Sequence, residues 1–216
     1  MIQKSKVTVI GLGNIGTTVA TNLVKGNHSV IVADKTFEKA TELAKKLGNL
    51  AQPATIADAI KQANIVVLAI YFDAIKAFFK TYATELQGKI IVDPSNPIAP
   101  DENGGFKKII GTDESAGEIL SSLLPNSVKL VKALGTLGAA SLASAAFQTP
   151  EKAVQFYATD DTSINTEIED LIRDNGFEPL RIGGLNQSIR IEVFGDLHEF
   201  GALGKTVTLD EAKQSI

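Results

Sequence analysis

The 216-residue sequence is long enough to bury a sizeable core, and its 44% hydrophobic and 21% charged residues are ordinary for a globular protein, which excludes intrinsic disorder. Its net charge of −4 provides no positive field for phosphate backbones or acidic lipids, so we expect no nucleic-acid partner. Because the sequence contains no cysteine, it excludes disulfides, thiolate nucleophiles and cysteine-ligated metal sites.

Short β-branched runs alternate with longer segments of helical periodicity, which is typical of a parallel sheet covered by helices on both faces. The start of the chain leads directly into a strand pattern instead of a signal peptide, and no apolar run approaches the ~20 residues of a membrane span. We therefore expect a cytoplasmic protein with no membrane-embedded part. In chain order, the predicted strands are Lys6–Ile10, Ser29–Ala33, Ile65–Ile70, Lys89–Val92, Val128–Val131 and Val154–Ala158. The predicted helices are Asn14–Lys25, Phe37–Leu47, Thr55–Gln62, Asp73–Leu86, Ser115–Leu123 and Ser163–Asp174.

Two irregular stretches interrupt this alternation. The first, from Val92 to Ser115, is rich in proline and glycine and is longer than most connections in compact domains, which indicates a functional or mobile loop. The second, from Ala133 to Thr149, is rich in small residues that permit close approach to a ligand or another subunit. We predict an α/β protein: a Rossmann-type doubly wound parallel sheet over residues 1–184, and a small C-terminal helical segment over residues 185–216.

The strongest motif is a glycine-rich turn placed between the first strand and the first helix. Gly11 permits the tight turn, Gly13 lets the backbone approach a pyrophosphate, and Gly16 lets helix and strand pack closely. The free N–H groups at the start of the helix would then bind phosphate oxygens. We predict dinucleotide binding here by Gly11, Leu12, Gly13, Asn14 and Ile15.

Asp34 follows the second strand, 18 residues after Gly16, where a carboxylate can accept both ribose hydroxyls of an adenosine. The alternative is a carboxylate at the start of the next helix. Asp34 would repel a 2′-phosphate and so favours NAD, whereas Lys35, Thr36 and Lys39 could receive that phosphate if Asp34 turned aside. We predict that Asp34, Lys35 and Thr36 contact the coenzyme. The coenzyme is expected to be NAD or NADP, and Asp34 favours NAD.

The order of several motifs resembles that of the deazaflavin (coenzyme F-420)-dependent NADP reductases and their bacterial NADP oxidoreductase relatives. The segments that carry the resemblance are residues 9–16, Val67-Leu68-Ala69-Ile70, Ile91-Val92-Asp93-Pro94-Ser95-Asn96-Pro97, Ser115-Ala116-Gly117-Glu118-Ile119-Leu120 and Val131-Lys132-Ala133-Leu134-Gly135-Thr136. The resemblance implies NADP as coenzyme, a compact Rossmann domain with a small C-terminal piece, and hydride transfer to a second, flavin-like or other acceptor. It also implies that the nicotinamide lies near three loops, which contribute Ile70 and Tyr71, Asn96 and Pro97, and Leu134 and Gly135.

The chemistry of the remaining residues is consistent with hydride transfer, because that reaction depends mainly on positioning two rings and tolerates the lack of an acid–base set. His198 is a weak candidate for a proton donor, and the alternative is a histidine on a helix surface or at an interface. We predict no metal site, because the acidic residues beside His198 are not accompanied elsewhere in the sequence by further metal ligands at a suitable spacing.

We therefore expect an NAD(P)-dependent oxidoreductase acting on an unidentified small-molecule electron acceptor: flavin-like, quinone, ferric or other. The alternative is a catalytically silent NAD(P)-binding sensor or interaction module, since a nucleotide-binding fold does not by itself establish turnover. The short C-terminal segment and the apolar stretch from Ile189 to Phe194 also predict a homodimer.

Overall fold

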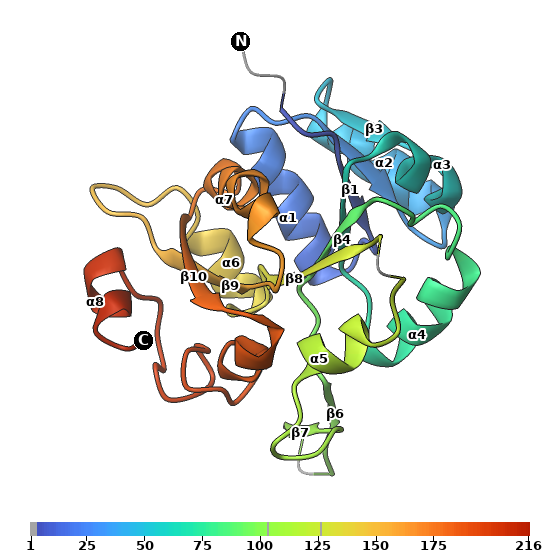
Figure 1. The fold of residues 1–216 in the computed structure, drawn as a ribbon. Coiled ribbons are helices and arrows are strands. Elements are labelled where there is room, and N and C mark those ends of the chain that lie inside the picture. Colours follow the sequence, from blue (N-terminus) through green and yellow to red (C-terminus); the bar gives the residue numbers. More distant parts are fainter. Residues whose placement is uncertain (1–3, 103, 126) are drawn as a thin grey trace.

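The computed structural model describes residues 4–102, 104–125 and 127–216. Within these residues an eight-stranded sheet has the order β10-β9-β8-β5-β4-β1-β2-β3, and β6 and β7 form a separate antiparallel hairpin (Figure 1). The main-sheet strands are β1 Val7–Ile10, β2 Val30–Ala33, β3 Ala51–Pro53, β4 Ile65–Leu68, β5 Ile90–Asp93, β8 Lys129–Ala133, β9 Val154–Ala158 and β10 Glu178–Gly183. The hairpin strands are β6 Ile98–Pro100 and β7 Phe106–Lys108.

Helices cover both faces of the sheet, as expected for strands in which successive side chains point to opposite faces. Valines of β1, β2 and β4 pack in one cluster with α1 Asn14–Lys25, α2 Phe37–Leu47, α6 Ala139–Ser144 and α7 Asn165–Asp174. Alternating residues of the same strands pack on the other face with α3 Ile56–Gln62, α4 Phe72–Thr81 and α5 Ala116–Ser121. The predicted doubly wound Rossmann-type fold is confirmed.

The direction of the last two strands differs from the prediction of a fully parallel sheet. From β3 to β8 all neighbours are parallel, whereas β9 is antiparallel to β8 and parallel to β10. β9 overlaps β8 only through the pairs Lys132↔Ala158 and Ala133↔Tyr157. The apolar pattern of a buried strand is the same in both directions, so the sequence could not reveal this reversal.

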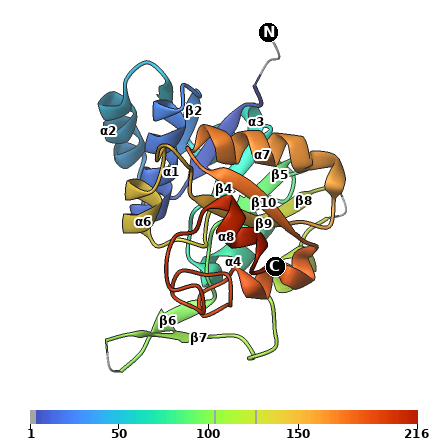
Figure 2. The same ribbon diagram turned by 90° about the vertical axis from the view of Figure 1, so that its left-hand side faces the viewer.

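The segments that were predicted as irregular contain short elements. The stretch from Ala133 to Thr149 holds α6, which contacts α1 through a hydrogen bond from Asn22 Nδ2 to the Leu142 carbonyl (3.1 Å). The stretch from Val92 to Ser115 holds the β6–β7 hairpin, which projects from the body of the molecule in both views (Figures 1 and 2). β3 and β10 were also missed: β3 has only three residues, and both are edge strands whose polar residues and prolines weaken the strand periodicity.

The C-terminal segment contains two short helical elements joined by turns, in agreement with the predicted small helical segment. After Gly184 the chain forms a 3-10 helix over Leu185–Arg190, a series of turns, and the short α8 helix Leu209–Lys213. Ile191, Leu197 and Val207 of this segment pack in one cluster with Val154 and Phe156 of β9. The segment therefore covers the end of the sheet (Figure 2), and the domain boundary at Gly184 stays a prediction.

Candidate functional site

The glycine-rich turn lies at the carboxyl end of β1, where β1 stands between β2 and β4 and the connections diverge to the two sides of the sheet. Gly11 has φ +89°, and a Cβ there would collide with the Ala69 carbonyl at the end of β4. A Cβ on Gly16 would collide with the Gly11 carbonyl oxygen. Both glycines are therefore required by close backbone packing, at the crevice where open α/β sheets bind ligands.

The amino end of α1 faces open space. Gly13 is its N-cap; among the described residues, no side chain caps the helix and no atom lies within 4 Å of a Cβ built on Gly13. Gly13 and Asn14 are exposed, whereas Leu12 is buried and Ile15 packs against the core. The first turn of this 12-residue helix thus presents its N–H groups to whatever lies in front of it, an arrangement suited to a pyrophosphate.

The Asp34 carboxylate is fixed between the glycine-rich turn and the start of α2. Its Oδ2 accepts a hydrogen bond from the Leu12 N–H (2.8 Å), and its Oδ1 accepts one from the Thr36 N–H (3.0 Å). Asp34 therefore satisfies the helix-start interpretation, while each oxygen keeps a further lone pair for a ribose hydroxyl. Lys35 and Thr36 are exposed beside it.

A small cavity of about 250 Å³ adjoins the glycine-rich turn between α1 and α2. Its lining residues are Leu12, Thr17, Lys39, Glu42, Leu43 and Lys46. Lys39, one of the residues weighed for a 2′-phosphate, therefore lies next to the turn, and Lys46 adds a second ammonium group.

The three loops predicted around the nicotinamide follow β4, β5 and β8, which are neighbours in the sheet, and so they meet at one edge. Tyr71 is 88% exposed and Ile70 is half-buried against the turn at Gly11. A Cβ on Gly135 would meet the Pro94 carbonyl, so the loops after β5 and β8 are in direct contact. Leu134 is fully buried beneath them with φ +62°, and Pro97 is also buried.

Asn96 bridges these loops and the C-terminal segment. Its Nδ2 donates to the Gly135 carbonyl (3.1 Å), and its Oδ1 accepts from the Val193 N–H (2.8 Å). The Asn96 amide group has two Nδ2 hydrogens, and the Gly135 carbonyl accepts one of them. The second Nδ2 hydrogen is therefore left for a ligand. Contact between Asn96 and the nicotinamide stays a prediction.

His198 lies in a turn and not on the helix envisaged from the sequence, and it is only 1% exposed. Its Nε2 contacts the Gly135 carbonyl (3.0 Å), and its Nδ1 accepts from the Phe200 N–H (3.0 Å). Burial lowers the pKa of His198, against smaller opposing effects of the Gly135 carbonyl and of Glu199. With both nitrogens engaged, the ring is placed to hold a loop, and its use as a proton donor stays a prediction.

A buried ion pair at this edge was missed by sequence reasoning. Lys132 Nζ contacts Asp93 Oδ2 (2.8 Å) and the Ser95 carbonyl (2.6 Å), and both charged side chains are at least 96% buried. Asp93 Oδ1 in turn accepts from the Ser95 N–H (2.8 Å). The available signal was a lysine and an aspartate inside otherwise apolar central strands.

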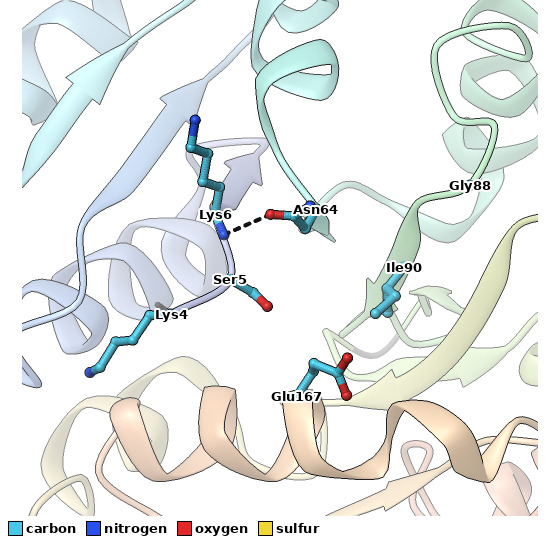
Figure 3. A pocket seen from close by; sticks show the side chains of 7 residues that line it. All are labelled: Lys4, Ser5, Lys6, Asn64, Gly88, Ile90 and Glu167. Atoms are coloured by element: carbon cyan, nitrogen blue, oxygen red, sulfur yellow. Dashed lines mark hydrogen bonds between the residues drawn. The ribbon is translucent and has the colours of Figure 1, made fainter. Parts of the chain in front are cut away.

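A larger cavity of about 370 Å³ lies at the opposite, amino edge of the sheet (Figure 3). Its lining residues are Lys4, Ser5, Lys6, Asn64, Gly88, Ile90 and Glu167. The hydrogen bond drawn there joins the Lys6 N–H to Asn64 Oδ1 (3.0 Å), which ties the start of β1 to the residue before β4. This cavity is therefore remote from the loops that follow the strands.

Neither a metal-binding cluster nor a membrane-spanning helix occurs in the described residues. No cluster of three or more histidine, aspartate or glutamate side chains that could hold a metal ion is found there. Within the same part of the chain, no helix combines the length and apolar character needed to cross a membrane.

The chain is similar in sequence to a family of NADP oxidoreductases and to several known proteins. The sequence profile of the family described as "NADP oxidoreductase coenzyme F420-dependent" matches residues 6–97, which include the glycine-rich turn and the Pro94–Pro97 loop. The chain is 26% identical to the metalloreductase STEAP3 of Rattus norvegicus over 190 residues, 88% of this chain and 36% of that protein. It is 28% identical to the F420-dependent NADP reductase of Methanocaldococcus jannaschii over 139 residues, 59% of this chain and 61% of that protein.

The chain thus spans about a third of the length of the first relative and about three-fifths of the second. A solved structure of a hypothetical protein from Sinorhizobium meliloti matches with a TM-score of 0.81 at 26% identity, over 94% of this chain and 95% of that chain. The resemblance to the deazaflavin-dependent NADP reductases is confirmed.

Proposed function

We propose that the chain is an NAD(P)-dependent oxidoreductase that transfers hydride between a nicotinamide coenzyme and a small-molecule electron acceptor. The observation that carries the proposal is the uncapped amino end of α1, open in front of Gly13 at the diverging point of the sheet. The N–H groups of this turn would hold the pyrophosphate, and Asp34 would accept from the adenosine ribose.

The three loops after β4, β5 and β8 would orient the nicotinamide. The coenzyme supplies the hydride, so these residues need only exclude water and hold the ring against an acceptor. Ser95 Oγ is buried there and has no hydrogen-bond partner among the described residues, which leaves a polar atom for a ligand amide. Exposed Tyr71 offers an aromatic surface at the same edge.

The acceptor is sought by direct assay. NADH and NADPH oxidation is followed by absorbance with flavin, deazaflavin, quinone and ferric compounds as acceptors. Turnover of any of these supports the oxidoreductase, whereas tight coenzyme binding without turnover, together with a coenzyme-dependent change in assembly, would favour a sensor. We retain a cytoplasmic location as part of the proposal, in keeping with the cysteine-free composition.

We further infer that NADH is preferred to NADPH, because Asp34 is held by two main-chain N–H groups and is not free to turn away from a 2′-phosphate. Replacement Asp34→Ser should remove the repulsion and leave Lys35 and Lys39 nearby. We expect NADH affinity to fall about tenfold and NADPH affinity to rise, measured by titration calorimetry.

Lys35→Ala in the Asp34→Ser background is the matched control, and it should reverse the gain for NADPH. The preference for NADH would be contradicted if the unmodified protein bound NADPH more tightly than NADH. That result would agree with the name of the F420-dependent NADP reductase to which the chain is similar. A protein that binds neither coenzyme would contradict the proposed function itself.

A further inference from the structure

The C-terminal segment reaches back to the edge of the sheet and holds two of the three loops. Val193 donates its N–H to Asn96 Oδ1 (2.8 Å), and the His198 ring contacts the Gly135 carbonyl through Nε2 (3.0 Å). Asn96 Nδ2 donates to the same Gly135 carbonyl (3.1 Å). That oxygen is therefore held from two directions, by residues 39 and 63 positions away in the sequence.

The hydrogen bonds define the protonation of the ring. Because Phe200 donates its N–H to Nδ1 (3.0 Å), Nδ1 carries no hydrogen, and Nε2 carries the ring proton that it donates to Gly135. His198 is thus the neutral tautomer with no free nitrogen. Its ring also lies beside that of Phe200, with centroids 5.5 Å apart.

The segment is itself anchored, so it can act as a fixed support. The buried Glu192 carboxylate accepts from the Ala116 N–H (3.1 Å), the Gly117 N–H (3.3 Å) and the Ser188 hydroxyl (2.7 Å). Glu199 accepts from the Gly138 N–H at the start of α6. These contacts fix the backbone on both sides of the turn that presents His198.

We propose that His198 is a positioning residue for the nicotinamide end of the coenzyme, acting through the Gly135 carbonyl and the Leu134–Thr136 turn. The inference rests on the proposed function and assigns the C-terminal segment a part in it. In this role His198 holds the loop against which the ring is placed, and no proton transfer is required of it. Loss of this contact should therefore affect the nicotinamide half of the coenzyme and spare the adenosine half.

The test compares ligands that contain or lack the nicotinamide. His198→Phe keeps an aromatic ring but removes the donor, and the probes are NADH and ADP-ribose, or NADPH and 2′-phospho-ADP-ribose if NADPH is the tighter coenzyme. By titration calorimetry, His198→Phe should bind the dinucleotide about tenfold more weakly than the unmodified protein does. Its affinity for the ADP-ribose probe should change by less than about twofold. His198→Gln retains a donor and should restore most of the loss.

His28→Phe is the control, since this buried histidine hydrogen-bonds Asp174 Oδ2 (2.7 Å) and the Ser5 carbonyl (3.0 Å) at the other edge of the sheet. It should leave the ratio of the two affinities unchanged. If His198→Phe does not fold, His198→Leu removes the same donor and should give the same selective loss. The inference would be overturned if His198→Phe lowered the affinity for both probes equally, or lowered neither affinity. If the unmodified protein bound neither probe, the proposed function itself would be overturned.

Discussion

At the scale of single residues, two glycines of the same turn have separable tasks. Gly16 sits where any side chain would collide with the Gly11 carbonyl, so it serves the packing of α1 on β1. Gly13 has an ordinary φ of −78° and open space where a side chain would stand, so the fold does not require it. The space in front of Gly13 is instead what a pyrophosphate would need.

The two alanine substitutions should therefore give opposite results. Gly16→Ala should lower the free energy of unfolding by at least about 2 kcal/mol, because the backbone must move to admit the methyl group. Gly13→Ala should cost less than about 1 kcal/mol in stability, typical of an N-cap change. It should nevertheless weaken NADH binding about tenfold or more by obstructing the pyrophosphate. Urea unfolding and calorimetry measure the two effects, and unchanged coenzyme affinity in Gly13→Ala would contradict this division.

At the scale of elements, the buried pair of Asp93 and Lys132 joins the carboxyl ends of β5 and β8. The lysine also holds the Ser95 carbonyl, so the strands and the loop that follows β5 share one network. A buried charge that loses its partner is strongly destabilising, whereas removal of both charges is far less costly.

Lys132→Met should lower the free energy of unfolding by about 3–5 kcal/mol, since it leaves the Asp93 carboxylate buried without its cation. The double variant Asp93→Asn with Lys132→Met should recover much of this loss. Lys129→Met, on the same strand, removes a half-exposed contact with Asp161 and should cost less than about 1 kcal/mol. Similar losses in Lys129→Met and Lys132→Met, by urea unfolding, would show that the buried pair has no special weight.

At the scale of the whole molecule, the C-terminal segment buries part of the surface that was expected to need a second subunit. Ile191 and Glu192 are buried within the chain itself, which corrects the reason first given for a dimer. Phe194 and Phe200 of the same segment remain 53% and 61% exposed. We retain the homodimer as a proposal supported by these exposed rings.

Sedimentation tests the proposal. The unmodified protein should sediment as a dimer, and the double variant Phe194→Ser with Phe200→Ser should shift toward the monomer as apolar contact area is lost. Exposed Phe106 on the β6–β7 hairpin provides a control, since Phe106→Ser should leave the assembly unchanged. The homodimer would be contradicted if the unmodified protein sedimented as a monomer at high concentration.

Much of the fold follows from the sequence alone. The alternation of apolar strands with amphipathic helices predicts six strands and six helices that the structure contains, and the glycine-rich turn is placed between the correct two elements. These features are local, because they depend on side-chain periodicity and on backbone freedom within a few residues. Asp34 could be proposed from its position after the second strand, whereas its hydrogen bond with Leu12 joins residues 22 positions apart and is known only from the structure.

How the loops after β5 and β8 are held depends on contacts between segments far apart in the sequence. The reversal of β9, the pairing of Asp93 with Lys132, and the contacts of Asn96 and His198 with Gly135 join residues 24 to 63 positions apart. Short-range patterns carry no record of such meetings, because a buried lysine or histidine looks the same in sequence whether it is paired or not. The glycine-rich turn could thus be identified from the sequence itself, whereas the contacts that hold the loops after β5 and β8 form only when distant segments are brought together.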